Sequence, residues 1–250
     1  MEFVTLNTRR YVRFAGLAAL PGLAHAWSLR PTDVGPRTGA GDAPAAAARA
    51  DLARDLGGDP DRLTYALQVH GHGLAVVDTA SPSGAVAEVD ALVTTQVGRP
   101  LMTFSADCPL IVVYDPGRRV LGLVHASWRC TVARATRQLV ETMVARGGCE
   151  PGELWAGIGP SAGPCCYEVQ DDVRAAARAS LPEADRFFPA RDGRMTFDLW
   201  AANRAELRAA GLRDERIEVT DLCTMCRADL FFSYRREGRT GRFALAAVMV

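Results

Sequence analysis

Two short apolar segments joined by a turn decide how this chain folds. Residues 105–129 read SADCPLIVVYDPGRRVLGLVHASWR. The apolar segments are residues 110–114 and 120–124, and the turn sequence Asp115-Pro116-Gly117 lies between them. Strands joined by a tight turn lie side by side, so this pattern predicts a β-hairpin. Cys108 precedes the first strand and His125 follows the second, so the hairpin places both residues at the same end.

Cysteine thiolate and neutral imidazole are two of the ligands that zinc prefers, which makes Cys108 and His125 candidate metal ligands. An upstream segment, Gln68-Val69-His70-Gly71, supplies a further imidazole that would complete a His-Cys-His set. The spacing is not that of a zinc finger, and isolated Cys and His residues are more often packed or exposed than metal-bound. The residues alone therefore leave a metal site and a packing role both open.

Length and composition indicate a globular protein that acts on a small molecule. The 250 residues suit one large domain or two small ones, and they are 48% hydrophobic and 23% charged. Lys plus Arg equals Asp plus Glu at 29 each, so no overall field attracts nucleic acid or an anionic membrane. No apolar run approaches the roughly 18 residues of a membrane span.

The cysteine pattern points to a reducing compartment, and we expect a cytoplasmic protein. Seven cysteines cannot all pair within one chain. Cys165 and Cys166 are adjacent, and Cys223 and Cys226 form a C-x-x-C, both more natural where thiols stay reduced. The C-x-x-C would be half of a zinc ribbon, but the sequence shows no second C-x-x-C, so we predict structural thiols.

The N-terminal region imitates a signal peptide. Arg9-Arg10 precedes an apolar stretch at residues 14–23, and Ala24-His25-Ala26 resembles a cleavage site. Arg13 shortens the apolar stretch and Pro21-Gly22 interrupts it. We therefore predict a strand or short helix that leads into residues 23–29.

The hydrophobic periodicity predicts an α/β fold with mixed sheets and flanking helices, formed as a single domain over residues 1–250. The hairpin argues against a purely parallel sheet. The expected helices are residues 46–56, 131–145, 173–180 and 199–210. Besides the hairpin, the expected strands are residues 63–69, 74–77, 91–95, 101–104, 154–158, 217–219, 230–234 and 243–250.

Seven motifs follow one another from about residue 63 to the C-terminus. They are QVHG at 68–71, SADCPL at 105–110, VHASWR at 124–129, GIGPSAGPCCYEV at 157–169, DLWAANR at 198–204, DLCTMC at 221–226 and FFSYRREGRTGR at 231–242. In this order they resemble the laccase-domain or YfiH-type family, once labelled multicopper polyphenol oxidases and now assigned as purine nucleoside phosphorylases. The resemblance implies a YfiH-like single domain.

The resemblance also implies a zinc ion, with copper as the alternative, held by His70, Cys108 and His125. Three protein ligands leave a fourth position for water, which is the pattern of a catalytic site. The implied activity is phosphorolysis of adenosine, inosine, guanosine or methylthioadenosine, with adenosine deamination beside it. The partners would be a purine nucleoside and phosphate, and we expect a monomer or homodimer.

Further catalytic and substrate-binding residues follow from their places in these motifs. Arg129 would bind phosphate or ribose, or form an ion pair, and Arg30 would also meet an anion. Asp107 would orient a ligand or accept a proton, or cap a turn. With Cys108 and His125, Arg129 and Asp107 make up the predicted catalytic set.

Two positions depart from the family, which usually has glycine where this chain has Ser127 and Cys130. Glycine often supplies a positive φ or a close backbone approach, so these replacements would alter the site. We place Ser127 in the pocket with Gln68, which alternates to the same face as His70 in an extended segment. The predicted substrate-binding residues are thus Gln68, Arg30 and Ser127.

Three alternatives to a phosphorylase remain. A copper-dependent polyphenol oxidase needs separate copper centres, which one His-Cys-His set does not supply. A cysteine-type amidase acting on peptidoglycan precursors would use Cys108 as nucleophile and His125 as base. A catalytically impaired binding relative would follow if Ser127 and Cys130 disable the site.

Overall fold

The predicted hairpin lies at the centre of the structure. In a computed structural model that describes residues 1–37, 39–191 and 193–250, it forms β9 (Leu110–Asp115) and β10 (Val120–His125). The strands pair antiparallel, with His125 opposite Leu110. Every residue of both strands is buried, because each strand carries apolar side chains on both faces. The prediction for this segment is confirmed.

Strands β9 and β10 belong to a six-stranded mixed sheet. Its order is β14 (Ile217–Val219), β11 (Trp155–Ile158), β9, β10, β7 (Ala91–Thr94) and β5 (Leu74–Val77). One face packs against α4 (Ala135–Gly147) and α6 (Leu199–Ala209), where Leu139, Met143 and Leu207 are buried. Gly122 of β10 permits this close approach, since an added Cβ would lie 2.9 Å from the Met143 sulfur.

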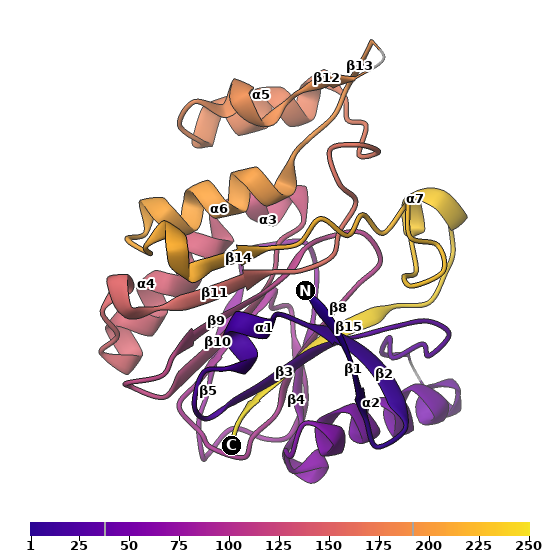
Figure 1. Ribbon diagram of the computed structural model, residues 1–250, viewed down its shortest axis with the longest axis vertical. Helices are drawn as coiled ribbons and strands as arrows, with labels where there is room; N and C mark the ends of the chain where they lie inside the picture. Colours follow the sequence, from indigo (N-terminus) through magenta and orange to yellow (C-terminus); the bar gives the residue numbers. More distant parts are fainter. Residues whose placement is uncertain (38, 192) are drawn as a thin grey trace.

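The other face packs on a seven-stranded mixed sheet, and Trp27, Tyr114 and Phe243 are buried between the two sheets. The second sheet has the order β1 (Glu2–Leu6), β2 (Arg9–Arg13), β3 (Leu23–Ser28), β15 (Phe243–Met249), β8 (Leu101–Ser105), β4 (Thr64–Leu67) and β6 (Gly84–Ala87). Its outer face is covered by α2 (Ala43–Asp55) through Leu52. The result is four layers, helix–sheet–sheet–helix (Figure 1).

Shorter elements complete the fold. Beyond α6 lie α5 (Asp171–Ser180) and the small ribbon β12 (Ala190–Arg191) and β13 (Arg194–Met195), at the top of Figure 1. Their buried side chains form a separate cluster around Phe188 and Phe197. The other short helices are α1 (Ala15–Ala18), α3 (Trp128–Val132), α7 (Tyr234–Glu237) and the 3-10 helices Gly39–Asp42, Pro60–Arg62, Pro151–Glu153, Ala184–Phe187 and Asp214–Arg216.

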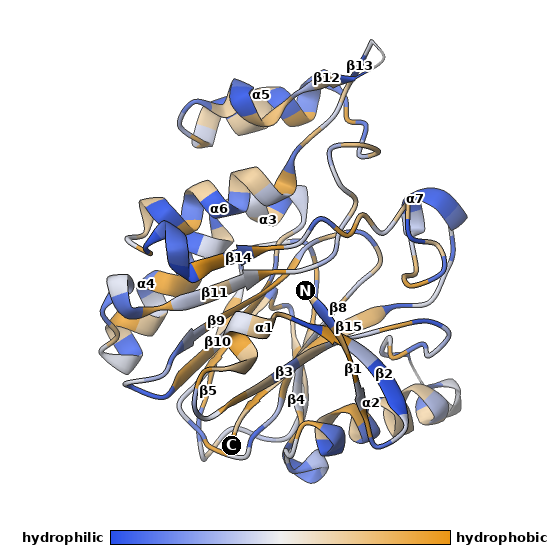
Figure 2. Ribbon diagram, in the orientation of Figure 1, coloured by the Kyte–Doolittle hydropathy of each residue, from blue (hydrophilic) through white to orange (hydrophobic). Residues whose placement is uncertain are grey.

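The predicted fold class, α/β with mixed sheets and flanking helices, is confirmed. Hydropathy explains this layering. In Figure 2 the strands between the helix layers are predominantly hydrophobic, while the outward-facing turns of the helices are polar. None of the described helices is long and apolar enough to cross a membrane. The signal-like stretch contributes to the core instead, with Phe14, Leu17 and Trp27 buried.

Two sequence predictions about elements were wrong. Residues 230–234 do not form a strand; the carbonyl of Phe231 accepts hydrogen bonds from the side chains of Arg30 and Arg236, not from a neighbouring strand. The helix expected at 131–145 is divided at Arg134, which has a left-handed φ of 60° and is the N-cap of α4. The guanidinium of Arg134 pairs with Glu206 at 2.9 Å. The strands predicted at 63–69 and 74–77 do form, as β4 and β5.

One prediction tests how the N-terminal segment packs. A Cβ added to Gly157 of β11 would lie 2.6 Å from side-chain carbons of both Phe14 and Leu17. We expect Gly157→Ala to lower the free energy of unfolding by about 1–3 kcal/mol, the usual cost of overpacking. Gly41→Ala is the control, because its added Cβ meets nothing within 4 Å. Urea denaturation of both variants measures the difference, and equal stabilities would contradict the packing of α1 on β11.

Candidate metal centre and active site

A cavity of about 510 Å³ opens where β4, β8 and β10 end. Its volume lies within the range of small-molecule sites. His70, Cys108 and His125 all line it, and so do Gln68, Asp107, Ser127 and Arg129. The structure thus brings together all of the site residues predicted from the sequence except Arg30.

The three candidate ligands converge from separate segments. His70 follows β4 in a left-handed conformation with φ of 60°, Cys108 lies in the β8–β9 connection, and His125 ends β10. One ligand atom of each lies within 4.8 Å of the others, and the two imidazole rings are 5.0 Å apart between centroids. Two imidazoles and one thiolate form a donor set suited to zinc, and copper also takes these ligands.

A buried carboxylate, Asp90, holds two of these ligands in place. Its side chain accepts a 2.7 Å hydrogen bond from His125 Nδ1, so Nε2 of that ring is the atom available for a metal. It also accepts backbone N–H groups of Val69, His70 and Gly71 at 2.8–3.3 Å. Burial alone would raise the pKa of Asp90, but His125 and the backbone donors outweigh it and the pKa falls below its usual value.

The ionisation of the candidate ligands follows from the same surroundings. Burial lowers the pKa of His70, and neighbouring His125 adds to this, so the imidazole stays neutral as a metal ligand must. Burial raises the pKa of the Cys108 thiol, and Cys130 and Asp107 reinforce the shift. Cys108 therefore ionises readily only beside a cation.

Gln68 and Asp107 both face the cavity but are also fixed by strong hydrogen bonds. The amide of Gln68 donates to the carbonyl of Phe104 at 2.7 Å and accepts from its N–H at 2.8 Å, so it continues the pairing of β4 with β8. The carboxylate of Asp107 accepts from Thr224 Oγ1 at 2.6 Å and from the N–H of Arg235 at 2.7 Å. Asp107 thus joins three segments of the cavity wall.

The two family glycine positions are occupied without backbone strain. Ser127 has a φ of −56°, and its side-chain oxygen caps α3 by accepting the N–H of Cys130 at 3.2 Å. Cys130 is helical and buried, with its sulfur 2.9 Å from the same oxygen. Neither position has a positive φ, so neither requires glycine for its backbone conformation.

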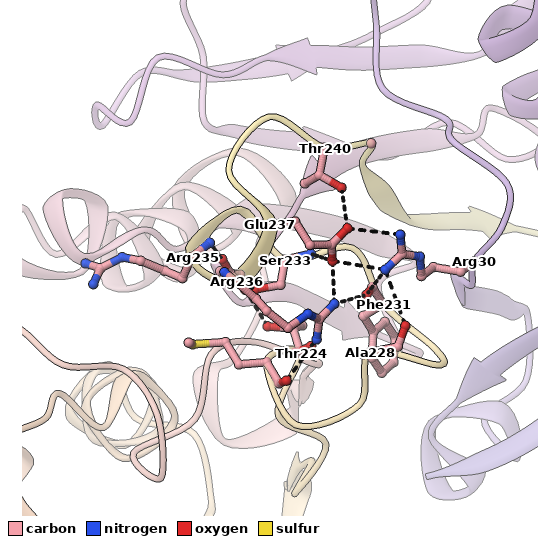
Figure 3. Close-up of polar contacts among 12 residues, drawn as sticks. Arg30, Thr224, Ala228, Phe231, Ser233, Arg235, Arg236, Glu237 and Thr240 are labelled. Carbon is pink, nitrogen blue, oxygen red and sulfur yellow. Dashed lines mark hydrogen bonds and ion pairs between the residues drawn. The ribbon is translucent and has the colours of Figure 1, made fainter.

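The two arginines predicted to bind an anion lie in different places, one at the cavity and one outside it. Arg129 is exposed at the cavity, with its guanidinium 4.3 Å from the centre of the Trp128 ring, and within the described part of the chain it makes no ion pair. Arg30 lies outside the cavity, and its guanidinium makes two hydrogen bonds to Glu237. Figure 3 shows Arg30 and Arg236 both directed at Glu237, while Arg235 points away from them. The expected contact of Arg30 with substrate is therefore not supported.

Sequence reasoning missed several residues that line the cavity or lie directly behind its candidate ligands. Asp90 precedes β7, whose start lies beside the end of β10, so only the pairing of those strands could have revealed it. Arg235, Arg242 and Tyr167 also line the cavity, and the Arg235 guanidinium lies 4.8 Å from the centre of the Tyr167 ring. Three arginines therefore face the same space as the His-Cys-His set.

Known proteins resemble this chain in sequence and in fold. Purine nucleoside phosphorylase YlmD of Geobacillus stearothermophilus is 37% identical over 206 residues, which cover 78% of this chain and 74% of that protein. Adenosine deaminase RL5, from an unknown prokaryotic organism, is 37% identical over 201 residues, 76% of each chain. The crystal structure of YlmD from Geobacillus stearothermophilus superposes with a TM-score of 0.87 at 30% identity, covering 96% of this chain and 98% of that one.

The match extends over nearly the whole chain. A family model described as "Multi-copper polyphenol oxidoreductase laccase" matches residues 28–250. This range contains all seven motifs and every candidate ligand. The chain therefore belongs to the multi-copper polyphenol oxidoreductase laccase family, to which its motifs already pointed.

Proposed function

We propose that this protein is a zinc-dependent purine nucleoside phosphorylase with adenosine deaminase side activity. Its substrates would be phosphate and adenosine, inosine, guanosine or methylthioadenosine, and its products the free base and the sugar 1-phosphate. The observation that carries the proposal is the convergence of a His-Cys-His donor set and three arginines on one cavity. The names of the relatives at 37% identity support it.

His70, Cys108 and His125 would hold the zinc ion, which supplies Lewis acidity and activation of water when bound. The chain's own contribution is the placement of these ligands. Asp90 keeps the Nδ1 proton on His125 and fixes the backbone at His70. Groups held in this way need no reorganisation during reaction, which is how preorganised sites lower barriers.

The arginines of the cavity would bind phosphate. A guanidinium is planar, stays charged and matches two phosphate oxygens at once. Arg129 and Arg235 each lie over an aromatic ring, Trp128 and Tyr167, which fixes the plane of the guanidinium. Ala66, Leu67 and Phe104 offer an apolar surface to the purine. In this proposal Asp107 positions Arg235 through its backbone N–H.

A polyphenol oxidase is the weaker interpretation despite the wording of the family description. The chain has four His in total. Two of them face the cavity, while His25 is buried with Nε2 accepting the N–H of Phe14, and His72 is exposed outside the cavity. One His-Cys-His set does not provide the separate copper centres that reduction of oxygen to water requires.

One observation favours a second candidate, a cysteine amidase. Asp90, His125 and Cys108 would serve as acid, base and nucleophile of a catalytic triad. As in such a triad, the carboxylate orients the imidazole. The raised pKa of Cys108 argues against it, because a nucleophilic cysteine needs a lowered one. Within the described residues, no hydrogen bond joins Cys108 to His125 either.

Replacing His70 tests the zinc-dependent reaction. We expect His70→Ala to lose the zinc of the cavity and at least about 100-fold in kcat/KM for adenosine with phosphate, since a ligand is removed. His72→Ala is the matched control, because His72 is exposed two residues away and does not line the cavity. Elemental analysis and assay of ribose 1-phosphate measure both effects; full activity in His70→Ala would contradict the proposal.

Replacing Arg129 tests the phosphate site. Loss of one charge-assisted contact is expected to raise KM for phosphate about 10- to 100-fold in Arg129→Met, while zinc content stays unchanged. Arg137→Met serves as control, because Arg137 pairs with Glu141 on the surface of α4. Steady-state kinetics at varied phosphate concentration would measure the KM for phosphate of both variants. An unchanged KM for phosphate would remove Arg129 from the site.

Alkylation distinguishes the phosphorylase from the amidase. A zinc-bound Cys108, which is half-buried in the cavity, is expected to resist iodoacetamide until a chelator removes the metal, and activity should disappear with the metal. A triad cysteine would be alkylated in the presence of the metal and would act without it. Peptide mass mapping of Cys108, before and after chelation, decides between them.

A further inference from the structure

Four cysteines meet beside the cavity, apart from the His-Cys-His set. Cys165 and Cys166 lie in the β11–α5 connection, and Cys223 and Cys226 lie between β14 and α7. All four sulfur atoms are within 4.8 Å of one another. The fold thus supplies the second pair of ligands that the C-x-x-C lacked in the sequence.

The sulfur separations suit a shared metal ion. Cys226 lies 3.4 Å from Cys166 and 3.7 Å from Cys165 between sulfur atoms. Four sulfurs about 2.3 Å from one zinc ion stand about 3.8 Å apart in a tetrahedron. Residues 164–166 form a turn, which allows adjacent cysteines to approach the same point; in a strand they would face opposite ways.

Disulfides account less well for the cluster. Adjacent Cα atoms are about 3.8 Å apart, below the roughly 4.4 Å minimum for a disulfide, so Cys165 and Cys166 do not pair readily with each other. All four cysteines are free thiols in the structure. Cys223 is buried while Cys226 is exposed, which gives an ion a path from solvent.

A backbone donor and an arginine fix the loops that carry the cluster. The sulfur of Cys223 accepts the N–H of Gly163 at 3.3 Å, which joins the two loops. The Arg236 guanidinium donates to the carbonyls of Thr224 and Met225, inside the C-x-x-C, and holds that turn in place (Figure 3).

We propose that Cys165, Cys166, Cys223 and Cys226 bind a second zinc ion in a closed structural site that holds the wall of the cavity. Four thiolates leave no position for water, which is the structural pattern. The two loops already meet where the N–H of Thr224 donates to the carbonyl of Ser161 at 2.9 Å. One loop carries Tyr167 of the cavity, and the other carries Thr224, which binds Asp107.

Zinc content tests this site independently of catalysis. After growth with added zinc and purification under reducing conditions, the wild-type chain is expected to carry about two equivalents by elemental analysis. Cys223→Ser with Cys226→Ser should lose one equivalent and keep the zinc of the His-Cys-His set, whereas His70→Ala should lose only the other. Cys149→Ala, at a buried cysteine that follows α4, is the control and should keep both.

Two further measurements cover the case in which the double variant does not fold. Cys226→His should retain about two equivalents, because imidazole is also a zinc ligand. In His70→Ala loaded with Co²⁺, four thiolates should give intense sulfur-to-cobalt charge-transfer absorption. The proposal is overturned if a folded double variant keeps the wild-type zinc content, if that absorption is missing, or if zinc-loaded protein contains a disulfide among the four cysteines.

Discussion

The hydrogen bonds of Asp90 are the interactions on which the site depends. One buried carboxylate binds the imidazole of His125 and the backbone of the segment that carries His70. It lies at the edge where β7 and β10 meet, so the six-stranded sheet fixes its place. A carboxylate buried in this way is tolerated only because five donors satisfy it, the fifth being the Cys130 thiol. Without Asp90, His70 would be carried by an exposed turn with little to hold its left-handed backbone.

A second set of contacts holds together the part of the cavity wall that contains Asp107. Asp107 ties the β8–β9 connection to Thr224 and to the start of α7, across separations of 117 and 128 residues in the chain. Glu237 in turn binds Arg30 and Arg236, which anchors α7 to the segment after β3. Asp107 holds the backbone of Arg235 at the cavity, and the four-cysteine cluster lies where the loop of Thr224 meets the β11–α5 connection. Arg30 thus contributes to the site at a distance, not by touching a ligand.

How far the sequence could predict this site depends on how local each contact is. The proximity of Cys108 and His125 follows from a turn and two apolar segments, so the hairpin was predictable. The mixed α/β fold was predictable for the same reason, since its strands carry clear apolar runs. Residue type made His70 a candidate, but only the motif resemblance assigned it to the same set, because its left-handed turn leaves no trace in periodicity. Strand pairing between distant segments places Asp90 behind the ligands, and loop contacts between distant segments bring Tyr167, Arg235 and Arg242 to the cavity, so these four residues could not be predicted. The strand prediction at 230–234 failed for a related reason. Its apolar side chains are buried, as in a strand, but arginine side chains and not a neighbouring strand donate to the carbonyl of Phe231.

In the proposed reaction the donor set and the arginines act on one nucleoside in one cavity. Assay of free purine and ribose 1-phosphate, formed from adenosine and inosine by the wild-type, zinc-loaded protein, tests this. We expect base and sugar phosphate to form in equal amounts, both to require phosphate, and removal of zinc by a chelator to abolish both. Release of base that ignores phosphate and chelator alike would contradict the proposed reaction.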